Sequence, residues 1–88
     1  MIRRRVSVYG QVQGVFFRDT ARRLAAQHGV SGWIRNAPDG SVEAVFEGAE
    51  DDVERLVRFC REGPRGAVVA RVDVSEEELE GMTGFSVR

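Results

Sequence analysis

The sequence has no lysine, and it holds only one cysteine, one histidine and two prolines. The lone Cys60 excludes an intramolecular disulfide, and on the apolar face of a predicted helix it is expected to act as a small hydrophobe. A single histidine without a second ligand beside it argues against a metal site. No apolar run approaches the ~20 residues that a membrane span needs, and the N-terminus lacks the apolar stretch of a signal peptide. We therefore expect a cytoplasmic protein without metal or cofactor.

Strong net charge is missing too. The formal net charge is −1, so no overall field would gather nucleic acid or acidic lipid. All 13 basic residues are arginine, and Arg3, Arg4 and Arg5 form a local basic run. We expect this run to alternate outward on a strand or to fray at the terminus, with contact to an anionic partner as the alternative.

What is present is a chain of the size of one domain. Eighty-eight residues leave no room for a second core, so residues 1–88 are predicted to form a single domain. A hydrophobic share of 42% and a charged share of 31% are typical of a compact, soluble globule. The small size favours a monomer.

Hydrophobic periodicity predicts five strands and two helices. The strands are expected at residues 2–9, 30–36, 41–47, 67–74 and 85–87. The helices are expected from residue 17 or 18 to Gly29 and from residue 50 to Gly63, and the acidic residues 76–78 are expected in a solvated loop. The order is β-α-β-β-α-β with a short C-terminal edge strand. It predicts an α+β, ferredoxin-like α/β sandwich with both helices on one face of an antiparallel sheet.

The stretch at residues 10–18 carries the strongest chemical signal. It contains Gly10 and Gly14, has no acidic residue, ends on Arg18 and precedes a helix. Such a segment can turn a row of backbone N–H groups inward and place a guanidinium beside them. With the helix N-terminus it would form an anion-binding pocket best suited to phosphate. A plain strand-to-helix turn is the alternative, because tight turns use glycine for backbone reasons alone.

Two stretches resemble signatures of the acylphosphatase family. Residues 8–18, Val-Tyr-Gly-Gln-Val-Gln-Gly-Val-Phe-Phe-Arg, closely resemble the first signature, and residues 32–36, Gly-Trp-Ile-Arg-Asn, followed by Gly40, Val42 and Gly48, resemble the second. Ile34 replaces a smaller apolar residue that is more usual in the family. The resemblance spans nearly the whole chain. It implies the ferredoxin-like fold and the hydrolysis of an acyl phosphate to a carboxylate and inorganic phosphate, without a metal.

The resemblance also assigns roles to residues. Arg18 matches the arginine that binds the substrate phosphate, and Asn36 matches the catalytic asparagine that orients water. On the residues alone, an arginine at a helix start such as Arg18 is unfavourable beside the helix dipole unless an anion lies next to it. Asn36 before Ala37-Pro38 is typical of a turn. If the first two strands run the same way, Arg18 and Asn36 would be neighbours at one sheet edge. Backbone contacts to phosphate are expected from Gln13, Gly14, Val15, Phe16 and Phe17, with backbone conformation mattering more than side-chain identity.

Three aromatic residues lie near these motifs. Phe16, Phe17 and Trp33 are expected to pack as core or wall residues, and for Trp33 the alternative is that it shapes an acyl pocket. His28 would lie at the far end of its helix from the site, so no side chain near either motif is an obvious general base. A dianionic phosphate could itself take the proton of the attacking water.

Two other functions stay open on the sequence. A non-catalytic anion-binding module on the same fold would need Arg18 but has less use for Asn36, so the presence of both favours turnover. A nucleic-acid module is opposed by the near-neutral charge and by the lack of an aromatic–basic RNA motif. The expected partners are a small-molecule acyl phosphate and inorganic phosphate as product, with no nucleic acid and no membrane.

Overall fold

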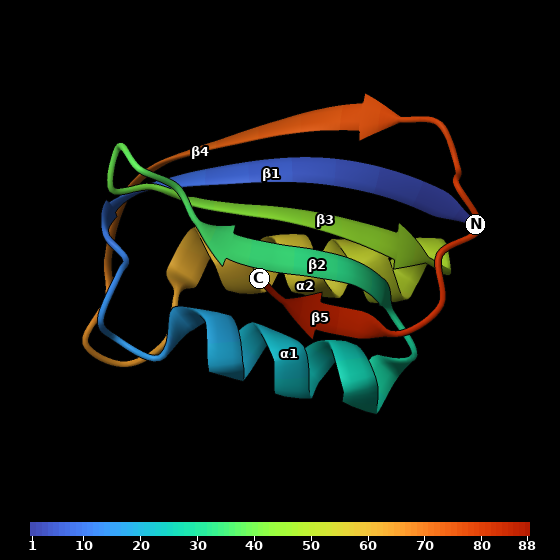
Figure 1. Ribbon diagram of the computed structural model, residues 1–88, viewed down its shortest axis with the longest axis horizontal. Coiled ribbons are helices and arrows are strands. Elements are labelled where there is room, and N and C mark those ends of the chain that lie inside the picture. Colours follow the sequence, from blue (N-terminus) through green and yellow to red (C-terminus); the bar gives the residue numbers. More distant parts are fainter.

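The computed structural model describes residues 1–88 and contains the seven expected elements in the expected order (Figure 1). They are β1 (Ile2–Gln11), α1 (Phe17–His28), β2 (Ser31–Asn36), β3 (Val42–Gly48), α2 (Glu50–Glu62), β4 (Val68–Glu77) and β5 (Phe85–Val87). Gly29 caps α1 with φ of 67°, the left-handed conformation that a helix end favours in glycine. Neither helix is long and apolar enough to cross a membrane.

The strands form one sheet in the order β4-β1-β3-β2-β5. The first four strands pair antiparallel, as predicted, while the short edge strand β5 runs parallel to β2 and makes the sheet mixed. Because β1 and β2 both pair antiparallel with β3, they run in the same direction. The loop after β1, the start of α1 and the end of β2 therefore meet at one end of the molecule, on the left of Figure 1.

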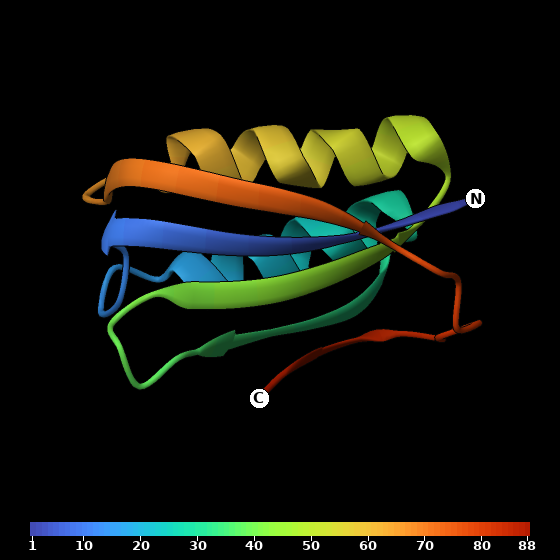
Figure 2. The same cartoon turned by 90° about the horizontal axis from the view of Figure 1, so that it is seen from above.

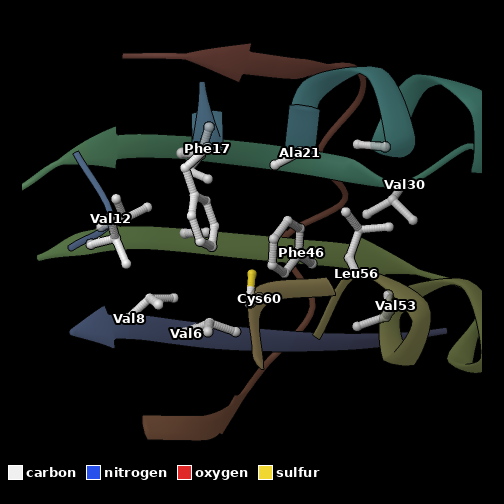
Figure 3. Packing of buried hydrophobic residues seen from close by; sticks show 14 residues of the cluster. Val6, Val8, Val12, Phe17, Ala21, Val30, Phe46, Val53, Leu56 and Cys60 are labelled. Atoms are coloured by element: carbon white, nitrogen blue, oxygen red, sulfur yellow. The ribbon is translucent and has the colours of Figure 1, made fainter. Parts of the chain in front are cut away.

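Both helices pack against one face of the sheet (Figures 1 and 2), and the core lies between them and the strands (Figure 3). On β1 the alternation places Val6 and Val8 in this core, both fully buried. On α2, Val53, Leu56 and Cys60 follow the spacing of a buried helical stripe. Cys60 is fully buried in the core cluster, which confirms it as a core residue, and this burial raises the pKa of its thiol to about 12.

The opposite face of the sheet carries ion pairs, and here two predictions were wrong. Arg3 neither points into solvent nor frays, because its side chain is only 3% exposed and bonds Glu77 on the neighbouring strand at 3.0 Å. Glu76 and Glu77 belong to β4 and not to a loop, since they stand opposite Arg4 and Arg3 in the sheet. Opposite charges directly across an antiparallel pair stabilise strand pairing. The arginine partners lie on another strand, so the run of three consecutive acids does not predict them.

The same network ties the C-terminal segment to the sheet. Glu47 on β3 accepts the backbone N–H of Glu80 and of Met82, each at 2.8 Å, and lies 3.4 Å from Arg3 Nη1. These bonds fix the connection between β4 and β5 and thereby deliver β5 to its place beside β2. That placement matters because Val87, at the end of β5, reaches the pocket described next.

Candidate active site

The loop between β1 and α1 has an unusual backbone. Gly14 has φ of 75°, and Phe16 has φ of 62°, the only positive φ outside glycine in the chain. Left-handed backbone in a bulky residue is disfavoured and tends to occur at functional sites. No backbone N–H group of residues 13–16 donates a hydrogen bond within the chain, and no side chain caps α1. These donors are therefore free for a ligand.

Arg18 follows immediately as the second residue of α1. Its side chain takes part in none of the chain's ion pairs or side-chain hydrogen bonds. A cation at the first turn of a helix is unfavourable beside the positive end of the helix dipole. An unpaired guanidinium next to unpaired N–H groups makes a site that favours an anion.

Asn36 lies on the sheet, at the same end of the molecule as Arg18. It is the last residue of β2, and it shares with the buried Ile34 the strand face that meets the helices. Its amide oxygen Oδ1 is buried and has no hydrogen-bond partner. A buried polar atom without a partner calls for an explanation, and a ligand or an ordered water in the adjoining pocket supplies one.

A cavity of about 470 Å³ joins these groups, within the usual size range for small-ligand sites. The predicted neighbourhood of Arg18 and Asn36 is confirmed, since both side chains line this cavity. Of the predicted loop residues, Gly14 and Phe16 also line it, and Phe16 is an exposed wall residue. The full lining is Val12, Gly14, Phe16, Arg18, Asp19, Arg22, Asn36 and Val87.

The other predicted loop residues, Gln13, Val15 and Phe17, do not line the cavity. Phe17 is buried and its ring lies 5.2 Å from that of Phe59, so it is a core residue as expected. Val15 packs against the core cluster. Gln13 also contributes through its side chain, because its Nε2 donates to the carbonyl oxygens of Ala37 and Ser41, both at 2.9 Å. These bonds anchor the loop to the turn that follows Asn36.

Trp33 and His28 both lie away from the cavity. Trp33 lies on the helix-free face of the sheet, where the guanidiniums of Arg5 and Arg88 stack on its ring at 5.4 and 4.6 Å from the ring centroid. It does not line the cavity, so the acyl-pocket alternative for Trp33 was wrong. His28 lies at the far end of α1, with Nδ1 3.9 Å from Asp52 Oδ1, and is not part of the site.

Four lining residues were not predicted from the sequence. Asp19 and Arg22 are half-exposed charges on a helix and gave no signal of their own. Arg22 could have been found from its spacing, because it follows Arg18 by four residues and so shares its helix face. Val12 is buried directly before the loop. Val87 carries no local signal, since only the parallel pairing of β5 with β2 brings it to the cavity.

Comparison with known proteins covers nearly the whole chain. The family model named Acylphosphatase matches residues 4–87. The chain belongs to the acylphosphatase family. An acylphosphatase of Trichormus variabilis is 56% identical over 88 residues, which are 100% of this chain and 87% of that protein. One of Rubrobacter xylanophilus is 59% identical over 85 residues, 96% of this chain and 77% of that protein. The crystal structure of acylphosphatase from Bacillus subtilis aligns with a TM-score of 0.95 at 35% identity, over 100% of this chain and 99% of that one.

Membership of the acylphosphatase family confirms the enzyme class and the ferredoxin-like fold that the two signatures predicted. Both signatures contribute to the cavity: Gly14 and Arg18 come from the first, and Asn36 comes from the second. The parts of an acylphosphatase that the sequence keeps apart are thus adjacent in space.

Proposed function

We propose that this chain hydrolyses the carboxyl–phosphate bond of an acyl phosphate to a carboxylate and inorganic phosphate. The phosphate is held by the loop N–H groups and Arg18, and the attacking water is oriented by Asn36. One observation carries the proposal: an unpaired guanidinium and a partnerless buried amide oxygen share a single cavity beside a loop with free N–H donors.

The chemistry requires little from the protein beyond position and charge. Water attacks phosphorus, a new P–O bond forms, and the bond to the acyl oxygen breaks with its electron pair leaving on the carboxylate. The carboxylate is a weak base, so no general acid is needed. Charge on the equatorial phosphoryl oxygens is stabilised by backbone N–H donors and the guanidinium, which need no reorganisation during the reaction. Asn36 offers a water both a donor and an acceptor without titrating.

The proton released by the water goes to the phosphate itself. The one carboxyl in the cavity lining is Asp19, whose pKa is lowered by the hydrogen bond from Arg22. A carboxylate held ionised by an arginine is a weak base, which makes it a poor acceptor for this proton. We therefore expect hydrolysis rates that do not follow the titration of a protein group near neutrality.

The deciding test is hydrolysis of benzoyl phosphate in the presence of a metal chelator. Arg18→Ala and Asn36→Ala are each expected to lower kcat/KM by roughly 100- to 1000-fold, the usual cost of one transition-state donor. Arg23→Ala is the matched control, since Arg23 is an exposed arginine of the same helix that does not line the cavity. Circular dichroism checks that each variant is folded.

The outcomes separate the rival functions. Full activity in either cavity variant would refute the assigned role of that residue. A wild type that binds inorganic phosphate without turning over benzoyl phosphate would instead establish the non-catalytic anion-binding module. The small size of the chain favours a monomer, so we propose that a monomer is sufficient for activity, which light scattering under assay conditions tests.

A further inference from the structure

Arg22 is a second cation in the cavity that the proposed hydrolysis does not use. It lies one helical turn after Arg18, and residues four apart project from the same helix face with Cβ atoms about 5–6 Å apart. Arg22 also lines an adjoining hollow of about 350 Å³ between α1 and β5. It therefore stands at the junction between the phosphate cavity and a groove that continues away from it.

The charge around Arg22 is only partly compensated. Asp19 accepts a hydrogen bond from Arg22 Nη2 at 2.8 Å with Oδ1, and its Oδ2 pairs with Arg23 Nη2 at 2.7 Å. One carboxylate thus faces two guanidiniums and offsets one of the two positive charges. Nη2 carries the only hydrogen bond of the Arg22 guanidinium, whose remaining N–H donors have no partner in the chain.

The groove beyond Arg22 has few polar side chains. Its lining consists of small and apolar residues apart from Arg22 and Ser31, including Ala25, Ala26, Val30 and Phe85. An acyl part that extends along α1 from a phosphoryl group held at Arg18 would pass Arg22 and enter this groove. The charged groups beside this path are the Arg22 guanidinium and the Asp19 carboxylate bonded to it, and of these two only Arg22 also lines the groove.

We propose that Arg22 binds a second negatively charged group on the acyl part of the substrate, so that this enzyme favours acyl phosphates with an anionic acyl group. The inference rests on the proposed function, because it requires the phosphoryl group to occupy the Arg18 end of the cavity. A guanidinium with free donors matches the planar geometry of a carboxylate, the smallest such group. Arg22 acts here as a specificity residue and takes no part in bond breaking.

The test compares two substrates of similar size, 3-carboxybenzoyl phosphate and 3-methylbenzoyl phosphate. The readout is the ratio of their kcat/KM values in the wild type, Arg22→Gln and Arg23→Gln. Arg23 pairs with the same Asp19 but is 74% exposed and lines neither hollow, so its variant controls for the loss of one positive charge on the helix. Arg22→Lys tests whether a positive charge alone is sufficient.

In Arg22→Gln the ratio of carboxy to methyl substrate is expected to fall roughly 3- to 10-fold, mainly through KM, as for a half-exposed charged hydrogen bond. Arg23→Gln should leave the ratio unchanged, Arg22→Lys should restore part of it, and added salt should reduce it in the wild type. An unchanged ratio in Arg22→Gln, or equal falls in both glutamine variants, would overturn the inference. If the wild type hydrolyses neither substrate, the proposed function itself is wrong.

Discussion

Replacing Glu47 with glutamine is expected to lower the free energy of unfolding by about 2 to 4 kcal/mol. Glu47 is 3% exposed, and its two oxygens accept the N–H groups of Glu80 and Met82 besides facing Arg3. Glutamine keeps the volume and one acceptor. It removes the charge, however, and turns the second acceptor into an NH₂ donor that faces a backbone N–H.

Two effects make up this magnitude. One backbone N–H of the β4–β5 connection loses its acceptor, which costs about 1–3 kcal/mol for a buried group. Arg3 loses one carboxylate but keeps Glu77 and Glu80 at 3.0 and 3.4 Å. Its penalty is therefore well below the ~3–5 kcal/mol of a buried charge left without any partner.

Urea unfolding at neutral pH measures the difference, with Glu54→Gln as control. Glu54 is an exposed glutamate on α2 without an ion pair, so its variant should stay within about 0.5 kcal/mol of the wild type. In a chain of 88 residues, a loss of 2 kcal/mol corresponds to a fall in Tm of roughly 8–16 °C.

Acid provides an independent check on the cause. The pKa of Glu47 is lowered below its ordinary value of 4.5, first by the N–H of Glu80 and then by Met82 and Arg3. A folded-state pKa below the unfolded one stabilises the protein above about pH 4.5, and this stabilisation is lost as the pH falls through the folded pKa. The gap between wild type and Glu47→Gln should therefore narrow below pH 4.5. Equal stability of the two proteins at pH 7, or a gap that persists in acid, would refute the reasoning.

Three further predictions concern the loop after β1, strand β2 and the core. Gln13→Ala removes both bonds to the turn after Asn36, and it should lower kcat/KM by roughly 10-fold with a smaller change in stability, measured by assay and urea unfolding side by side. Gly32→Ala would place a Cβ 1.8 Å from the carbonyl oxygen of Val45 at φ of 137°, so it should cost more than about 2 kcal/mol; a Tm within 4 °C of wild type would contradict this. Cys60 should resist alkylation by iodoacetamide at pH 8 until the protein is unfolded, because its thiol is buried with a pKa of about 12; modification of the native protein, followed by mass spectrometry, would show that the helix opens.

Local patterns were sufficient for most of the fold. The pattern at residues 41–47 predicted β3 and the stripe of Val53, Leu56 and Cys60 predicted α2, so period and turn chemistry located both elements within a residue or two. The position of the candidate site was predicted from topology. Because β1 and β2 run in the same direction, Arg18 and Asn36 lie at the same end of the sheet, although 18 positions separate them.

The unpredicted contacts of Arg3, Glu77 and Gln13 share a physical cause, because their partners lie far away in the sequence. Arg3 and Glu77 each look like an exposed charge in their own segment, and only the antiparallel pairing of β1 with β4 makes them a part-buried ion pair. Gln13 is similar, since the carbonyl oxygens that it bonds lie 24 and 28 residues away. Periodicity reports on one element at a time and holds no information on such contacts.

The part of the cavity wall that β5 supplies depends on this same long-range pairing. Val87 reaches the cavity because β5 runs parallel to β2, and β5 is delivered there by the connection that Glu47 holds through Glu80 and Met82. The groove that Arg22 overlooks is likewise closed on one side by Phe85 of β5. Glu47 does not line the cavity, yet it positions the strand whose Val87 lines the cavity and whose Phe85 lines the groove. Loss of the Glu47 carboxylate should therefore change the preference between acyl groups more than it changes phosphate binding at Arg18.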